Sequence, residues 1–333
     1  MNETFENEHY CRKMISRLAL GMLAGALIIQ AAATILTAIM YKYDSLTLLD
    51  KNSDIILSAV CVYCVGMPLT YLILKDMRHV HPHKNNISVG QFFKLFAVSY
   101  ALVYVSNIVG AVVISILTAI KGAPIENNVL DAVMNTDIVT ELIFMVILAP
   151  IVEELVFRKL IIDRTLIFGD KTAIFISALA FGLFHGNLSQ FVYAFTLGMI
   201  FAYVYIRTGN ILVTTGLHMM MNLLGSVVAS SLLKLIDIEK FLEVYSSGDM
   251  NEILRFIGDN ATGMMIFSAF ETLIFAILIT GIIIFFLNVR HLTLYEGEIL
   301  IPRESFFKTT VANLGMLLFI AYFIVLIIIQ IIK

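Results

Sequence analysis

Long apolar runs recur along the whole chain and constrain its fold more than any other feature. A bilayer core of about 30 Å needs about 20 apolar residues in one helix, and a helix pairs its own backbone groups where no water is available. Charged residues make up only 14% of the 333 residues, against about 25% in soluble proteins. The sequence therefore predicts an all-α polytopic membrane bundle. Nine runs are predicted to span the membrane, near 17–40, 54–75, 93–120, 138–160, 171–186, 188–206, 210–233, 263–288 and 310–332. Only Gly186 and Asn187 separate the fifth run from the sixth. We therefore expect eight to nine helices in one membrane domain, 1–333.

The distribution of basic residues predicts the orientation of this bundle. Of the 22 Lys and Arg residues, 15 fall in the N-terminal segment, in the loops expected on the same side and in the adjoining ends of the predicted spans, which leaves 22 − 15 = 7 on the other side. Basic loops stay in the cytoplasm, so we expect a multi-pass protein of the cell membrane with a cytoplasmic N-terminus. The loop at 234–262 on the other side is acidic and amphipathic, and we expect it to be a solvated loop. No basic tail or patch points to a nucleic-acid partner, and the oligomeric state is left open.

Ionisable residues inside the apolar runs are the candidates for function. Each costs about 2.5–3.5 kcal/mol at the centre of a membrane helix on insertion scales, so such residues tend to mark functional sites. They are concentrated on three of the predicted spans. Glu153, Glu154 and Arg158 lie on the fourth, His185 lies on the fifth, and His218 lies with Asn222 on the seventh.

The two adjacent glutamates have different surroundings on a helical wheel. Glu154 and Arg158 are four residues apart and share a face, in the order that favours an ion pair. Glu153 points about 140° away from Arg158 at 3.6 residues per turn, so it has no partner within its own helix. A free carboxylate can take a proton from water, as a general base does. The alternative is that Arg158 and Lys159 only mark the cytoplasmic end of this span, with the glutamates balancing their charge.

The polar residues of the three spans have a similar predicted depth. At a rise of 1.5 Å per residue, Glu153, His185, His218 and Asn222 lie about 15, 21, 12 and 18 Å from the predicted inner face, and the midplane lies about 15 Å from either face. A shared polar pocket would suit hydrolysis of a peptide bond, with Glu153 activating a water held with His185. His218 and Asn222 would then stabilise the oxyanion. Alternatively, Glu153, His185 and His218 would hold one divalent metal ion such as Zn²⁺.

Three motifs on these spans resemble a known family. EELVFR at 153–158, FGLFH at 181–185 and HMMMN at 218–222 are similar, in order and spacing, to the motifs of the CAAX protease and bacteriocin-protection family, formerly called the Abi group. The resemblance covers about 137–235 as a catalytic core and leaves 1–136 and 263–333 as flanking transmembrane helices. It implies a conical helical core with a catalytic cavity open to one side.

The resemblance also implies roles for individual residues. It makes Glu153 the base, His185 its water-binding partner, and His218 and Asn222 the contacts to an oxyanion or a metal. Glu154 and Arg158 become a structural pair, and Phe181 supports the site. Both a metalloprotease mechanism and a metal-free glutamate mechanism have been argued for the family, so one divalent metal ion and no cofactor are both retained.

We therefore expect an intramembrane endopeptidase that acts on a membrane-associated peptide or protein, such as a pheromone or bacteriocin precursor. One alternative is a non-catalytic immunity or scaffold protein that keeps the motifs. Another is a proton-coupled carrier in which Glu141, Glu153 and Glu271 form a relay. Carriers are commonly built from internal repeats, and the sequence has none. Glu141 lies near the outer end of its span, where we expect its side chain to reach the membrane interface.

Overall fold

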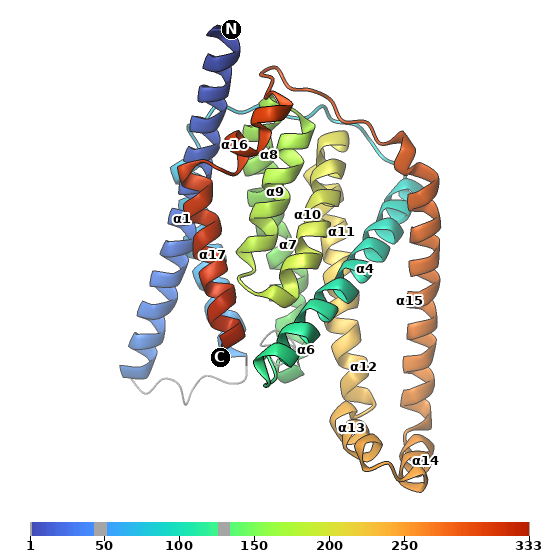
Figure 1. Cartoon of the computed structure of the whole chain (residues 1–333). Coiled ribbons are helices and arrows are strands. Elements are labelled where there is room, and N and C mark those ends of the chain that lie inside the picture. Colours follow the sequence, from blue (N-terminus) through green and yellow to red (C-terminus); the bar gives the residue numbers. More distant parts are fainter. Residues whose placement is uncertain (1, 43–51, 126–133, 333) are drawn as a thin grey trace.

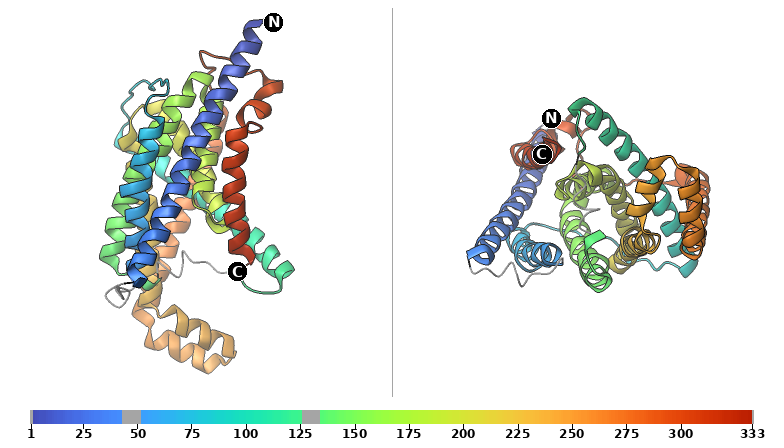
Figure 2. Two further views of the ribbon diagram at one scale, coloured as in Figure 1. Left: turned by 90° about the vertical axis from the view of Figure 1, so that its left-hand side faces the viewer. Right: turned by 90° about the horizontal axis from the view of Figure 1, so that it is seen from below.

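The computed structural model of the protein describes residues 2–42, 52–125 and 134–332, and this part of the chain contains helices and no strand (Figure 1). The predicted all-α polytopic bundle is confirmed. The central helices α7 to α11 lie between the α1–α17 pair on one side and α15 on the other (Figures 1 and 2). The helix α4 crosses the bundle obliquely and packs on both α10 and α15.

The nine predicted spans all fall on helices. The helices are α1 (Asn2–Lys42), α2 with η2 and α3 (Ser53–Ala59, Val60–Gly66, Met67–Leu74), α4 (Val89–Lys121), α6 with η3, α7, η4 and α8 (Ile138–Thr140, Glu141–Leu148, Ala149–Glu154, Leu155–Leu160, Ile161–Thr165), α9 (Asp170–Phe184), α10 (Leu188–Thr208), α11 with η6 and α12 (Ile211–Asn222, Leu223–Val228, Ala229–Leu235), α13 (Ile238–Ser247), α14 (Met250–Asp259), α15 (Ala261–Asn288), α16 (Phe306–Thr310) and α17 (Leu314–Ile332). The stretches η2, η3, η4 and η6 are π-helical turns within longer continuous helices. Such turns are common at functional sites.

Seven of these helices are long and apolar enough to cross a membrane by length and composition. The two predicted spans outside this group are the continuous helix from 138 to 165, hereafter the α6–α8 helix, and α9. The α6–α8 helix carries both glutamates and Arg158 within its apolar sequence. Helix α9 has 15 residues, which is about 22 Å at 1.5 Å per residue, so it is shorter than a bilayer core. These two helices hold most of the candidate site.

The loops gather at two ends of the bundle. At one end the backbone of Val80 donates to Asp163, Asn85 donates to Thr208, and Ile299 donates to Ile167. These bonds tie together three loops that hold many of the basic residues, together with the N-terminal part of α1 (Figure 1, top). We call this the basic end. The opposite end carries α6, α13 and α14 (Figure 1, bottom), and we call it the hairpin end.

Small residues allow α9 and α10 to pack closely. A Cβ on Gly198 would lie 2.8 Å from the Cα of Ala178, and one on Gly182 would lie 3.1 Å from the Cβ of Phe195. A side chain at Gly198 would require a helix to move, whereas one at Gly182 would require its neighbours to shift by a few tenths of an ångström. Gly186 adopts a left-handed conformation with φ of 64°, which suits glycine at the end of a helix. This residue therefore turns the chain from α9 into α10.

The acidic segment at 234–262 is not the plain solvated loop that its sequence predicts. It forms α13 and α14, an antiparallel hairpin that projects beyond the bundle (Figure 2, left). The rings of Phe241 and Phe256 pack at 5.7 Å between the two helices. Leu242, Tyr245 and Leu254 remain exposed. The amphipathic pattern seen in the sequence is the physical reason, because apolar residues at helical spacing give each of these short helices a face to bury.

Candidate active site

The predicted site residues come together around one cavity. Glu153 lies on α7, His185 follows the last residue of α9, and His218 and Asn222 lie on α11. All four side chains line a cavity of about 690 Å³ in the middle of the bundle, together with Phe181. The four residues that the sequence placed at a similar depth in the membrane thus line the same cavity.

Glu154 and Arg158 lie on the other face of the same helix. Both side chains are 0% exposed, and Glu154 Oε2 lies 3.0 Å from Arg158 Nε. The guanidinium also donates from Nη1 to Ser177 Oγ at 3.4 Å, and its carbon lies 4.6 Å from the centre of the Phe181 ring. A buried charge needs both a counter-charge and polar or aromatic partners. The pair therefore has the surroundings of a structural element.

His218 connects the two glutamates. Its Nδ1 lies 3.1 Å from Glu154 Oε1, and its Nε2 lies 3.8 Å from Glu153 Oε2. A carboxylate paired with Arg158 accepts a hydrogen bond, so Nδ1 carries the proton and a neutral ring presents its lone pair at Nε2. Only the doubly protonated ring can donate from Nε2. Glu154 therefore fixes the orientation of His218 as well as pairing with Arg158, a contact that the helical wheel does not predict.

His185 is held at the end of α9 by its own backbone. Its Nδ1 lies 2.8 Å from the carbonyl oxygen of Phe181. Because a carbonyl only accepts, Nδ1 is the donor and Nε2 of the neutral ring is left with a lone pair. The turn at Gly186 ends the helix one residue later, so the imidazole projects from a helix terminus that opens into the cavity.

Phe181 is the common neighbour of both histidines. Its ring stands edge-on to His185 with centres 5.0 Å apart, and edge-on to His218 at 5.8 Å. The same ring contacts the guanidinium of Arg158 and is 1% exposed. Edge-to-face contacts of this kind favour defined ring orientations. This arrangement agrees with the supporting role predicted for Phe181.

Asn222 uses one of its two amide protons within the protein. Its Nδ2 donates to the carbonyl oxygen of Met145 at 2.8 Å. That bond ties α11 to the π-helical stretch η3 and fixes the amide plane. The second proton of Nδ2 is left for the cavity, because an amide nitrogen carries two donors.

Comparison with known proteins supports the same segment. A family model described as type II CAAX prenyl endopeptidase Rce1-like matches residues 135–224, which include every predicted site residue. The match supports a place for this segment in the CAAX protease and bacteriocin-protection family. The comparisons with curated proteins and with solved structures gave no match. A CAAX-type protease is embedded in the membrane and acts on membrane-associated substrates, and the apolar helices make this chain a multi-pass membrane protein.

Tyr63 is a cavity residue that the sequence did not single out. Its hydroxyl lies 3.5 Å from Glu153 Oε1 and donates to it. It is located on η2, outside the matched segment, in the run CVYC, where a tyrosine among apolar residues gives no periodic signal. It also lines a second cavity of about 660 Å³ on the basic side of the bundle. Tyr63 is therefore the hydrogen-bond donor that holds one oxygen of Glu153.

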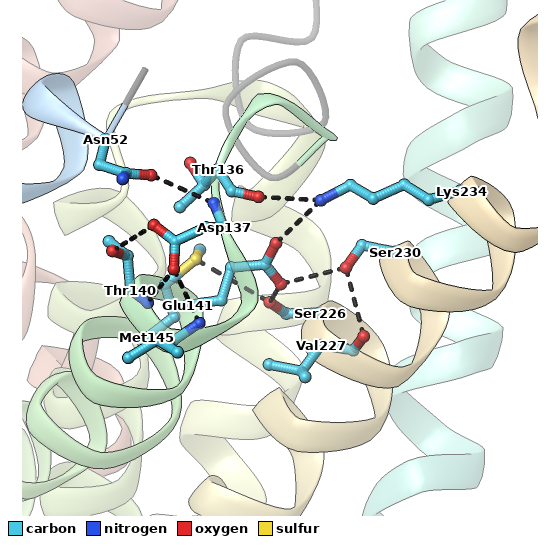
Figure 3. A network of polar contacts seen from close by, with 11 residues as sticks. Asn52, Thr136, Asp137, Thr140, Glu141, Met145, Ser226, Val227, Ser230 and Lys234 are labelled. Carbon is cyan, nitrogen blue, oxygen red and sulfur yellow. Dashed lines mark hydrogen bonds and ion pairs between the residues drawn. The ribbon is translucent and has the colours of Figure 1, made fainter. Parts of the chain in front are cut away.

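Glu141 lies in a polar network near the hairpin end of the CAAX-type core (Figure 3). The expectation that its side chain reaches the interface is wrong, because it is 1% exposed. It accepts from Ser230 Oγ at 3.0 Å, and Lys234 Nζ lies 3.4 Å away. Lys234 also donates to the carbonyl of Thr136 at 2.9 Å. A partner one helix away compensates the carboxylate, so it does not need to reach water.

Glu271 stands apart from the other glutamates. Its side chain is exposed on α15, and it is not among the residues that line the cavity. Glu141 is committed to Lys234 and the serines of α11–α12. In the predicted relay, Glu141 is therefore already paired with Lys234, and Glu271 lies outside the cavity that Glu153 lines.

The possible metal ligands do not form a complete set. Glu153 Oε2 and His218 Nε2 lie 3.8 Å apart, whereas two ligands of one tetrahedral zinc ion lie about 3.3 Å apart at bond lengths near 2.0–2.1 Å. Within 2–42, 52–125 and 134–332, no three side chains of His, Cys, Asp or Glu converge in a geometry that could hold a metal ion. The predicted trio of Glu153, His185 and His218 does not fit a metal ion in this arrangement.

Proposed function

We propose that the chain is an intramembrane endopeptidase that hydrolyses a peptide bond of a membrane-associated peptide or protein, with Glu153 as the general base. One observation carries this proposal. Of two adjacent glutamates, Glu154 is neutralised by Arg158 at 3.0 Å, whereas Glu153 faces the cavity, where the hydroxyl of Tyr63 donates to it and His218 Nε2 lies 3.8 Å away. A carboxylate in that position can accept a proton from water.

The attacking water is held by two acceptors. It donates one hydrogen to Glu153 and the other to Nε2 of His185, whose Nδ1 proton is already bonded to Phe181. This leaves an oxygen lone pair of the water free to attack the substrate carbonyl carbon. As the carbon–oxygen bond forms, Glu153 takes the proton and the carbonyl oxygen becomes an oxyanion. Collapse of this intermediate breaks the carbon–nitrogen bond, and Glu153 returns the proton to the leaving amine.

Asn222 and His218 stabilise the oxyanion in this proposal. Asn222 offers its second amide proton, since the first is bonded to Met145. His218 donates from Nε2 in its doubly protonated form, which Glu154 at 3.1 Å stabilises electrostatically. Removing one donor of this kind from a protease typically costs about 10²–10³ in kcat.

No step in this scheme uses a metal ion, because the ligand geometry does not fit one. We expect purified protein to keep its peptidase activity after prolonged treatment with a chelator and gel filtration, with metal content measured alongside. A loss of activity that returns on addition of Zn²⁺ alone would contradict the metal-free scheme while leaving the peptidase assignment intact.

Cleavage of quenched fluorescent peptides by the full-length protein in lipid nanodiscs tests the assignment. The peptide set includes leader sequences of peptide pheromones and bacteriocins, and products are identified by mass spectrometry. We expect cleavage at a defined bond by the parent and by Glu271→Gln, a change at an exposed glutamate outside the cavity. Glu153→Ala and His185→Ala should be inactive. If these two variants cut as well as the parent, the proposal fails.

The same preparation separates the alternative functions. Absence of cleavage together with protection of cells against a bacteriocin would favour a non-catalytic immunity protein. Proton flux in sealed vesicles that is lost in Glu153→Gln, with no cleavage of any peptide, would favour a carrier.

A further inference from the structure

We infer that the substrate reaches Glu153 from the hairpin end, so that the enzyme cleaves peptides on the non-cytoplasmic side of the membrane. This inference rests on the proposed function and adds the side of the membrane from which the substrate comes. Two observations carry it: the position of the cavity along the helices, and the barrier between the cavity and the basic end.

The cavity lies in the half of the bundle nearer the hairpin end. On the α6–α8 helix, which starts at the hairpin end, its lining residues are Phe144, Met145, Ala149 and Glu153, and none follows Glu153. Other lining residues follow the same pattern along their helices, from 55 to 63 on α2–η2, from 190 to 197 on α10, and from 218 to 226 on α11–η6. Glu153 is therefore at the inner limit of a hollow that extends toward the hairpin end.

Packed side chains close the cavity toward the basic end. Arg158, Phe157 and Phe201 are at most 1% exposed, and the guanidinium of Arg158 lies against both Phe181 and Phe201. A charged layer that is fully dehydrated gives no path for water or for a peptide. Glu153, His185 and His218 are consequently reached from the hairpin side.

The second cavity does not give an alternative route. It lies on the basic side and is lined by residues such as Lys75, His81 and Lys159. Its walls include Val152 and Val156 of the α6–α8 helix but not Glu153, His185 or His218. The two cavities share Tyr63 as a lining residue, and the candidate catalytic side chains line only the first.

The charge distribution then assigns a side of the membrane to each end. The loops 75–88 and 289–305, which are joined to the bundle at the basic end, hold Lys75, Arg78, Lys84, Arg290 and Arg303, and such loops remain in the cytoplasm. The cavity extends toward the hairpin end, which is then on the non-cytoplasmic side. The substrate class is therefore a peptide or a juxtamembrane segment that has already crossed the membrane. A lipid-modified carboxyl terminus held at the cytoplasmic leaflet would instead meet the closed side.

Cysteine labelling in intact cells tests the inference without relying on activity. A parent lacking the three native cysteines (Cys11→Ala, Cys61→Ala and Cys64→Ala) receives single cysteines at four positions. Asn107→Cys and Ser58→Cys report on the cavity, because both residues line it and are exposed. Glu243→Cys reports on the hairpin, and Lys84→Cys reports on the basic end. Each is treated with a membrane-impermeant maleimide before and after permeabilisation.

We expect the hairpin and cavity cysteines to react in intact cells and Lys84→Cys to react only after permeabilisation. Reaction of the hairpin and cavity cysteines only after permeabilisation would overturn the assigned orientation. If the hairpin cysteine reacts in intact cells but the cavity cysteines, like Lys84→Cys, react only after permeabilisation, the inferred direction in which the cavity opens would be overturned. Cavity cysteines that never react, while both ends do, would overturn access from water.

An activity measurement connects the orientation to the substrate. The peptide set described above is added outside sealed right-side-out vesicles and, separately, outside inside-out vesicles. Cleavage should occur in the right-side-out vesicles and be at least tenfold slower in the inverted ones until detergent is added. The reverse preference would overturn the inference, whereas absence of cleavage in both, even with detergent, would count against the peptidase itself.

Discussion

The two faces of the α6–α8 helix can be compared through Glu153 and Glu154. These neighbours have the same chemistry and nearly the same depth, yet Glu154 is 0% exposed and Glu153 is 18% exposed. Glu154 contacts Arg158 and His218, whereas Glu153 faces a cavity of about 690 Å³. A step of one residue on a helix turns a side chain by about 100°. That rotation separates a group that stabilises the fold from a group that is free to react.

Replacing Glu153 should have the largest effect on activity and a small effect on stability. Glu153→Gln keeps the size of the side chain and removes the proton acceptor, so kcat/KM should fall by about 10²–10⁴-fold. The thermal unfolding temperature in detergent should stay close to that of the parent, because Glu153 faces the cavity and its oxygen lies as far as 3.8 Å from His218 Nε2. An equal loss of stability in Glu153→Gln and Glu154→Gln would show that the two faces are not distinct.

Replacing Arg158 should have the largest effect on stability. Arg158→Met leaves Glu154 charged and buried, and breaking one side of a buried pair costs about 3–5 kcal/mol. Denaturant unfolding in micelles measures this loss, with Lys159→Met as a control on the same helix because the Lys159 side chain is 50% exposed. The double variant Glu154→Gln/Arg158→Met should recover part of the stability. If it does not, the pair is not the source of the effect.

Phe181 should affect both properties to an intermediate degree. Phe181→Leu removes the ring that contacts Arg158 and both histidines, and cation–π and aromatic contacts together are worth about 1–3 kcal/mol. We expect a similar loss of stability and a lower kcat with little change in KM. Phe184→Leu is the matched control, since Phe184 packs on Phe157 and Phe323 but not on a histidine. Equal losses of kcat in both variants would argue against a positioning role for Phe181.

The Glu141–Lys234 pair should give the smallest effect. Lys234 is 38% exposed, so solvent screens its attraction to Glu141, and a double-mutant cycle of Glu141→Gln and Lys234→Met should give a coupling of at most about 1 kcal/mol. Activity should remain near the parent value. A coupling as large as that of the Glu154–Arg158 pair would mean that the hairpin end is as dry as the centre of the bundle.

Much of the fold followed from the sequence because a bilayer limits the choices. Apolar runs of membrane length had to be helices, and each predicted span lies on one. The pairing of Glu154 with Arg158 was equally accessible, since both partners lie on one helix and the 3.6-residue period fixes their relative direction. Depth along three helices was enough to group Glu153, His185, His218 and Asn222.

Contacts between helices were not accessible in the same way. The bond from His218 to Glu154, the donation from Tyr63 to Glu153, and the pairing of Glu141 with Lys234 each join residues more than 60 positions apart. No periodicity within one helix encodes them, because they depend on helix rotation and crossing. The end of α9 at Phe184 was by contrast predicted to within two residues, because Gly186 is a local stop signal.

Tyr63 lines both hollows of the bundle and also donates its hydroxyl to Glu153. An intramembrane hydrolase has to admit water to its reactive centre without conducting it across the bilayer. The size of the side chain at this position therefore bears on two properties, the position of the base and the space in which the two hollows meet.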